Sequence, residues 1–132
     1  MQVTIVTIEK NMANVTKKLK ASDFKRSSCP VAKTLDIIGD KWSLLVLRDL
    51  FADKSTYSEF QESPEAIPTN ILADRLSRFV EQGLIEKSPY QERPVRYAYT
   101  LTPKGRDLGP LLIEMVKWGE KYFPGSKARI KK

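Results

Sequence analysis

The first regular pattern of hydrophobic positions lies at residues 30–38, where apolar side chains recur about one helical turn apart. Pro30 suits the first position of this helix because its fixed φ is helical, and Gly39 suits its end. Residues 41–51, KWSLLVLRDLF, are apolar nearly all round. A helix without a polar face must be buried, so this segment is predicted to form the centre of the core.

Two further helices are predicted before any strand. Residues 53–64, DKSTYSEFQESP, predict a short helix that a hydroxyl side chain at position 55 or 56 can cap. In residues 69–82, a narrow apolar stripe predicts an amphipathic helix with Thr69 as its N-cap and Gly83 just after its end. The opposite face of this helix carries Asn70, Asp74, Ser77, Arg78 and Glu81.

A two-stranded hairpin is predicted after this helix. The first strand starts at Leu84, and the second spans residues 95–101, where apolar and polar side chains alternate. Between them, residues 88–94 (SPYQERP) are typical of a proline-bounded hairpin tip. Arg93 lies in this tip, close in sequence to Arg96, so the predicted tip is basic.

The last predicted helix follows Thr102 as its N-cap and should be kinked or divided at Gly109-Pro110. Its apolar residues are too widely spread around the helix for one core to cover, which indicates a second partner surface. Packing within the chain's own core is the alternative explanation for at least half of them. The main apolar set comprises Leu108, Leu111, Leu112, Met115, Trp118 and Tyr122.

The order of these elements predicts an α+β, mainly α, winged helix-turn-helix fold with additional N- and C-terminal helices. In such a fold one helix fits the major groove of DNA, and the thin hairpin lies along the adjacent minor groove. Asn70 can then bond adenine, and Arg78 can reach guanine or a phosphate. The predicted contacts of this recognition helix are Thr69, Asn70, Ala73, Asp74, Ser77 and Arg78. The predicted wing and supporting contacts are Arg93, Arg96, Thr56 and Ser58.

The composition excludes several other chemistries. The chain has no His and a single Cys, Cys29, so His-dependent triads, His-based zinc sites and an internal disulfide are ruled out. Neither a metal nor a cofactor is predicted. No apolar run approaches the roughly 18 residues of a membrane helix, and the start of the chain lacks a signal-peptide pattern. A cytoplasmic protein is therefore expected.

The net charge of +7 suggests a polyanionic partner, but its distribution weakens that inference. Residues 1–28 hold six Lys and Arg against two acids, and residues 117–132 hold six against one. The stretch between them is slightly acidic. We therefore predict a basic extension over residues 1–28 (strand, helix or disordered), a folded domain over 29–123 and a basic tail over 124–132.

Three segments resemble the HxlR family of bacterial winged-helix transcription regulators, relatives of the MarR type. They are CPVAKTLDIIGDKWSLLVLRDLF, IPTNILADRLSRFVEQGLIEK and RPVRYAYTLTPKGRDLGPLLIEMVKWGE. The resemblance implies a cytoplasmic, nucleoid-associated repressor or autoregulator. It also implies a homodimer on an inverted-repeat operator, paired through its first and last helices. Residues 69–82 would be the recognition helix and residues 84–101 the wing.

Cys29 is the remaining candidate for chemistry. It is predicted at the N-cap of the first helix, where the helix dipole and the nearby Lys25 and Arg26 would favour a thiolate. The resemblance implies that a cysteine at this position can sense oxidants or electrophiles, since some members of the family use it so. An inert cap near the dimer interface is the alternative. A small-molecule effector bound near Trp42, Tyr97 and Tyr99 is a weaker expectation, because core packing is the better explanation of these rings.

Two other classes of function compete with a sequence-specific regulator. A nucleic-acid binder without sequence preference could use the basic termini alone, and it would show a steep salt dependence without an operator. A protein-interaction winged helix is the other, although the polar face around Asn70 and Arg78 is small and charged. An enzyme is not predicted, because Cys29 has no imidazole to activate it.

Overall fold

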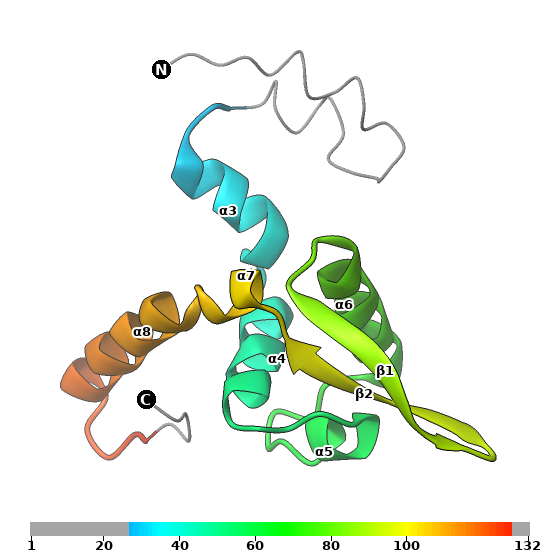
Figure 1. The fold of residues 1–132 in the computed structure, drawn as a ribbon. Helices are drawn as coiled ribbons and strands as arrows, with labels where there is room; N and C mark the ends of the chain where they lie inside the picture. The colour runs from blue at the N-terminus through cyan, green and yellow to red at the C-terminus, as the bar shows by residue number, and fades with distance from the viewer. Residues whose placement is uncertain (1–26, 128–132) are drawn as a thin grey trace. The chain divides into compact units, whose positions relative to one another are not determined.

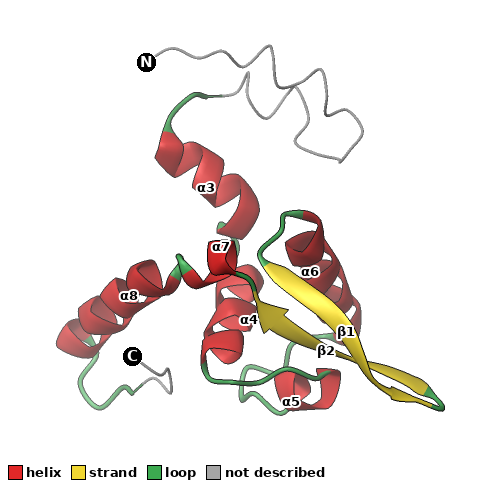
Figure 2. Cartoon of the chain, in the orientation of Figure 1, coloured by secondary structure: helices red, strands yellow, loops and turns green. Residues whose placement is uncertain are grey.

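The computed structural model describes residues 27–127, which form six helices and one two-stranded antiparallel sheet (Figures 1 and 2). The chain divides into two units, one ending at Leu44 and the other beginning at Leu45. None of the helices in the described residues has the length and apolar character needed to cross a membrane. The elements are α3 (Pro30–Ile38), α4 (Lys41–Phe51), α5 (Tyr57–Gln61), α6 (Thr69–Glu81), β1 (Ile85–Glu92), β2 (Val95–Leu101), α7 (Pro103–Arg106) and α8 (Gly109–Tyr122).

The first unit contains α3 and the start of α4, and its helix boundaries are those predicted. Cys29 occupies the N-cap position with an extended backbone, and Pro30 is the first residue of α3. Gly39 ends the helix by donating its backbone N–H to a carbonyl of the last turn at 2.8 Å. Asp40 then accepts a hydrogen bond from the backbone N–H of Ser43 at 2.7 Å, which satisfies a free donor at the start of α4.

The core of the second unit is formed by one face each of α4, α5 and α6, together with the base of the hairpin. α6 packs against β1 (Figure 1). Leu72, Leu76 and Phe79, one turn apart on α6, are at most 1% exposed, so the predicted apolar stripe faces inward and the polar face outward. The buried apolar residues of this unit are Val46, Leu47, Leu50, Phe60, Leu72, Leu76, Phe79, Leu84, Ile85, Tyr99 and Leu112.

Thr56 begins α5 through a capping box. Its Oγ1 accepts a hydrogen bond from the Glu59 backbone N–H at 3.4 Å, while Glu59 Oε1 accepts from the N–H groups of Ser55 at 2.8 Å and Thr56 at 3.2 Å. The N–H of Ser55, and then that of Thr56, lower the pKa of the Glu59 carboxyl because they favour its ionised form. Of the two predicted caps, the structure uses position 56.

The hairpin is longer and its turn tighter than predicted. β1 continues to Glu92, with an irregularity in register just after Pro89, and pairs antiparallel with β2. The predicted tip over residues 88–94 is therefore wrong, because the turn consists of Arg93 and Pro94 alone. Pro89 is compatible with a strand here because a two-stranded ribbon has two free edges, and a proline needs no ladder hydrogen bond on the free side.

A short helix, α7, follows the hairpin, and residues at its start form hydrogen bonds with the end of α6. Thr102 caps α7, since its Oγ1 accepts from the Gly105 N–H at 3.1 Å, and the same hydroxyl donates to the carbonyl oxygen of Gly83 at 2.6 Å. Lys104 Nζ donates to the carbonyl oxygen of Gln82 at 2.8 Å. These bonds satisfy carbonyl groups that the C-terminus of α6 leaves free. The predicted division of the last helix is confirmed, because α8 begins at residue 109.

A polar network connects the C-terminal half of α4 to the turn between α5 and α6. Arg48 forms a bidentate pair with Glu65, with both N–O distances 2.8 Å, and also donates to Asp49 Oδ1. The other carboxylate oxygen of Asp49 accepts from Ser63 Oγ at 2.6 Å, and Ser63 accepts from Lys54 Nζ at 2.8 Å. Asp49 and Ser63 are each 6% exposed, so the network holds a largely buried carboxylate with its partners in place.

The Arg48–Glu65 pair predicts a specific pH dependence of stability. Hydrogen bonds from Arg48 hold the pKa of the Glu65 carboxyl below its ordinary value of 4.5. A carboxyl whose pKa is lower in the folded state stabilises the fold above the unfolded pKa, and this contribution is lost as the pH falls through the folded pKa. Glu65→Gln should therefore lower the free energy of unfolding by about 1 kcal/mol or less near neutral pH, because the pair is partly exposed.

Urea unfolding at a series of pH values checks this expectation. The difference in the free energy of unfolding between wild type and Glu65→Gln should decrease toward zero as the pH is lowered below 4.5. Glu62→Gln is the matched control, because Glu62 is exposed in the same turn and lies outside the network. A difference in the free energy of unfolding that stays constant down to the lowest pH at which the protein is folded contradicts the role given to the pair.

Candidate nucleic-acid interface

The face of α6 opposite the core is polar and open to solvent. Asn70, Asp74, Ser77 and Arg78 are all exposed, and Ala73 is half-buried beside them. Their spacing of three and four residues places them on one side of the helix. The predicted recognition helix is thus confirmed as a helix with an exposed polar face, while the DNA contacts of its residues stay predictions.

Thr69 does not have the predicted capping role. The backbone enters the helix one residue earlier, so Pro68 occupies the N-cap position and Thr69 is the first residue of α6. The hydroxyl of Thr69 instead accepts a hydrogen bond from Gln61 Nε2 at 3.0 Å. This bond joins α5 to α6 across the turn of the helix-turn-helix.

Two arginines on α6 lie close to one carboxylate. Asp74 Oδ2 is 2.6 Å from Nη1 of Arg75 and 3.6 Å from Nη1 of Arg78. Arg75 was not predicted to be functional, because helical geometry places it at the flank of the polar face. The spacing of four residues in the sequence indicates the pair of Asp74 with Arg78, but residues one apart do not normally face each other on a helix, so no spacing signal identifies Arg75.

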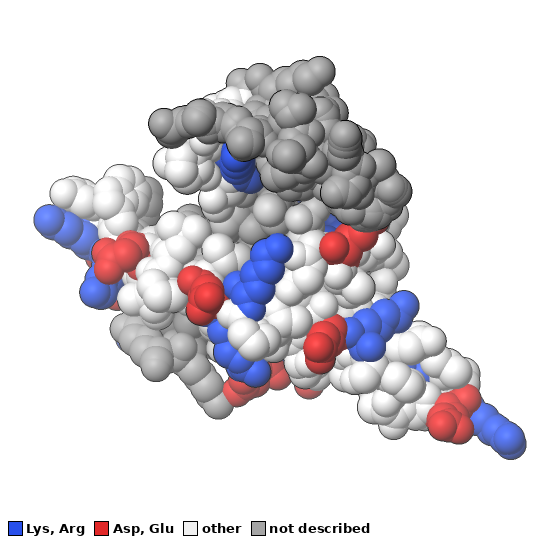
Figure 3. All heavy atoms as spheres, turned by 45° about the horizontal axis from the view of Figure 1, so that its top comes forward, with Lys and Arg blue, Asp and Glu red and all other residues white. Residues whose placement is uncertain are grey.

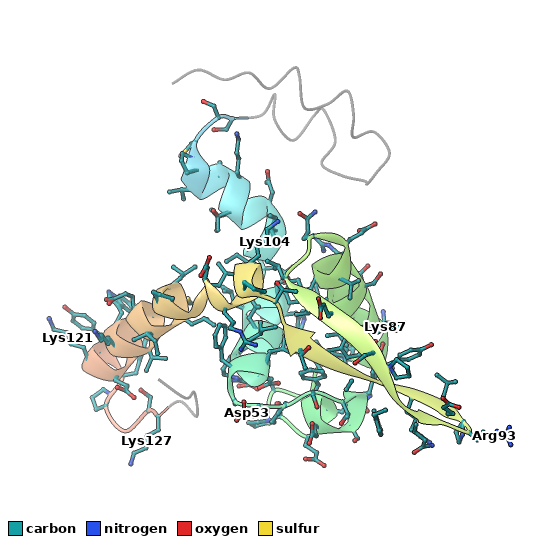
Figure 4. All side chains as sticks on the ribbon, in the orientation of Figure 1. Asp53, Lys87, Arg93, Lys104, Lys121 and Lys127 are labelled. Atoms are coloured by element: carbon teal, nitrogen blue, oxygen red, sulfur yellow. The ribbon has the colours of Figure 1, made fainter. Side chains whose placement is uncertain are left out.

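The wing presents its arginines at and near the hairpin turn. Arg93 lies at the far end of the hairpin and points away from it (Figure 4), and Arg96 is exposed on β2. Neither forms an ion pair with any residue of the described range. Lys87 Nζ lies 4.3 Å from the centroid of the Tyr97 ring, a cation–π contact between the two strands. The arrangement suits contacts with phosphates or a narrow minor groove.

The two predicted supporting hydroxyls differ in their availability. Thr56 Oγ1 is used in the cap of α5, and Ser58 Oγ, in an exposed side chain, lies 3.4 Å from it. Figure 3 shows basic and acidic side chains interspersed on one face of the described residues rather than gathered in a patch of one sign. This face therefore offers no strong, uniform attraction for a polyanion.

α8 presents an apolar stripe to solvent. Its members lie three and four residues apart, and they are Leu111, Met115, Trp118 and Tyr122, which are 41%, 47%, 61% and 55% exposed. A stripe of this kind marks an interaction surface. Leu112 is only 5% exposed and belongs to the core of its own chain, so its prediction as an interface residue is corrected, and Leu108 is half-buried. On α3, Val31 and Leu35 are likewise exposed, at 66% and 55%.

Cys29 is exposed at the start of α3. Its neutral side chain makes no capping hydrogen bond. The backbone N–H groups of Ala32, and then of Val31, nevertheless lower the pKa of its thiol because they favour the thiolate. Lys25 and Arg26, which the sequence placed near this thiol, lie outside the described residues.

The described residues contain no group of three or more His, Cys, Asp or Glu side chains placed to hold a metal ion. A cavity of about 440 Å³ lies between the C-terminal end of α4, the loop after it, β2 and Arg106. Tyr99 lines this cavity, and burial raises the pKa of its hydroxyl, but Tyr97 is not among the lining residues. Trp42 does not line the cavity either, so the predicted grouping of the three rings around an effector is not reproduced.

Comparisons with known proteins agree with this architecture. A sequence model of HxlR-like helix-turn-helix proteins matches residues 37–127. YdeP of Bacillus subtilis, an HTH-type transcriptional regulator, is 38% identical over 102 residues, which cover 77% of this chain and 78% of YdeP. The chain spans 59% of the length of the mycobacterial HTH-type regulators that it matches at 35% identity. These relatives are regulators rather than enzymes.

Two solved structures superpose on the chain. The crystal structure of PA1607 gives a TM-score of 0.68 with 46% identity and covers 78% of this chain and 72% of PA1607. The redox regulator HypR in its oxidised form gives a TM-score of 0.65 with 32% identity and covers 70% of this chain and 96% of HypR. The winged helix-turn-helix fold is therefore shared, and the exposed face of α6 lies in the helix that follows the turn.

The lowered thiol pKa of Cys29 can be measured by alkylation. The rate of reaction with iodoacetamide should reach its half-maximum at a lower pH in the native chain than in urea, because unfolding removes the aligned N–H groups of α3. The denatured chain is the internal control, since it holds the same single thiol. Equal inflection points in the two states would show that the helix does not activate Cys29.

Proposed function

Because the chain belongs to the HxlR-like helix-turn-helix family, we propose that it is a sequence-specific DNA-binding regulator of transcription. It would act as a homodimer on an inverted-repeat operator, as a repressor or autoregulator. α6 would enter the major groove, and the β1–β2 hairpin would contact the backbone or the minor groove beside it.

The observation that supports this proposal is the contrast between the two faces of α6. Leu72, Leu76 and Phe79 hold one face in the core, and the other face exposes an amide, a hydroxyl and charged groups. These are the side chains that form directed hydrogen bonds with base edges. A non-specific binder would need a dense basic surface, whereas the face shown in Figure 3 is mixed in charge.

The exposed stripes on α8 and α3 support the homodimer. Each exposes apolar side chains to solvent, and a second copy would cover them in a self-complementary way. Trp118 is the natural anchor, because its ring also contacts Tyr122 and Phe123, with centroids 5.1 Å and 6.0 Å away. Two recognition helices would then read two half-sites of an inverted repeat.

A signal could enter through Cys29, as the similarity to the redox regulator HypR suggests. The thiolate sulfur would add to an electrophilic carbon of a quinone, forming a carbon–sulfur bond. The displaced electron pair would move onto the quinone oxygen, which takes up a proton. This step needs no second cysteine and no separate oxidant, which suits a chain with a single thiol.

Operator binding tests the assignment of α6. Arg78→Ala and Asn70→Ala should each weaken binding by about tenfold or more, since a bidentate contact with a base contributes roughly 1–3 kcal/mol. Footprinting with the wild type should show two protected half-sites about one helical turn apart. Lys127→Ala is the control, because it removes an exposed cation from outside α6. If both α6 variants bind normally while removal of residues 124–132 abolishes binding, the proposal is wrong.

Sedimentation tests the dimer. The wild type should be a dimer at micromolar concentration, and Trp118→Glu should be a monomer, because a carboxylate cannot be buried unpaired in an apolar interface. Glu120→Gln, at an exposed position two residues away and off the apolar stripe, should leave the dimer intact. A monomeric wild type at the same concentration would exclude the interface.

A further inference from the structure

We propose that Asp74 is a specificity-determining residue of this regulator: its carboxylate, held by Arg75, positions the Arg78 guanidinium for a base and keeps it from nearby phosphates. This inference rests on the proposed function. It assigns opposite effects to one residue, because Asp74 would weaken binding to DNA in general and sharpen the choice between sequences.

The geometry gives the three residues different parts. Arg75 is the least exposed of them, with 17% of its side chain accessible, and its Nη1 lies 2.6 Å from Asp74 Oδ2. Asp74 is 54% exposed, and the same oxygen lies 3.6 Å from Nη1 of Arg78, which is 44% exposed. A largely covered arginine thus fixes a carboxylate, and the carboxylate attracts the more exposed arginine. The three side chains thus form a series from Arg75, at the edge of the core, through Asp74 to Arg78, on the face that would meet DNA.

Helix stability alone gives a weak reason for this arrangement. Asp has a low helix propensity in a helix interior, and one exposed pair at i and i+4 offsets only a similar amount. Residues one apart, such as Asp74 and Arg75, do not normally face each other on a helix. The pairing therefore adds little to the stability of the helix.

Electrostatics explain the trade between affinity and specificity. α6 contains two acids, Asp74 and Glu81, and two arginines, so the helix that would enter the groove has no net charge. Each carboxylate facing DNA reduces attraction to phosphates of any sequence. A guanidinium tethered by a carboxylate also loses freedom to reach a phosphate, yet it keeps donors for the O6 and N7 acceptors of a guanine. Neutrality and tethering together favour base contacts over backbone contacts.

The experiment compares the full chain with Asp74→Asn and Glu81→Gln. Both variants remove one negative charge from the exposed part of α6, but only Asp74 holds an arginine. Each protein selects duplexes from a randomised pool, and its affinities for the selected and an unrelated duplex are then measured. Thermal unfolding confirms that each variant is folded.

Asp74→Asn should bind unrelated DNA more tightly than the wild type and should lower the ratio of selected to unrelated affinity by about tenfold, the size of one lost base preference. The preference for guanine at one position of each half-site should relax. Glu81→Gln should bind unrelated DNA more tightly and keep the guanine preference.

Three outcomes overturn the inference. Equal loss of preference in both variants would show that charge alone matters. An unchanged guanine preference in Asp74→Asn, with lowered thermal stability, would show that the pair only stabilises the helix. A larger ratio of selected to unrelated affinity in Asp74→Asn than in the wild type would show that Asp74 lowers specificity instead of raising it. Failure of the proposed function looks different, because the wild type itself would then select no common sequence.

Discussion

The buried carboxylate of Asp49 is the constraint on which the placement of α6 depends. A carboxylate that is 6% exposed must have partners, and it finds them in Arg48 and in Ser63, fourteen residues away. Arg48 in turn forms two bonds to Glu65. The turn before α6 is thereby fixed to α4, and the start of α6 is fixed with it.

The other end of α6 is held by a different device. Gly83 has a φ of +75°, a conformation that favours glycine, and its carbonyl accepts from Thr102. A Cβ atom at Gly105 would lie 2.1 Å from the carbonyl oxygen of Leu84, so α7 can approach this corner only because residue 105 has no side chain. α6 is thus anchored at both ends by residues distant in sequence, and the β1–β2 hairpin starts from the same corner.

A helix held at both ends suits a surface that would distinguish between DNA sequences, and not only attract a polyanion. The excess of positive charge lies in residues 1–28 and 117–132, whereas α6 itself is neutral. Attraction to a polyanion and choice of sequence would then come from separate parts of the chain. Under the proposed function, such a division would let the basic tails increase the rate of encounter with DNA without weakening sequence discrimination by α6.

The sequence by itself determined the local structure. The apolar stripe of α6, Pro30, Gly39 and the capping box at Thr56 act through neighbours close in sequence, so these helices could be predicted from local spacing. The hairpin was predicted as well, but its strand length and its turn were not. Tertiary structure decided what depends on distant residues or on exact backbone direction: the network around Asp49, the burial of Leu112, and the displacement of Thr69 from its expected cap. The contact between Asp74 and Arg75 was also hidden, because residues one apart do not normally face each other on a helix. Long-range packing sets those distances, and only the folded chain defines them.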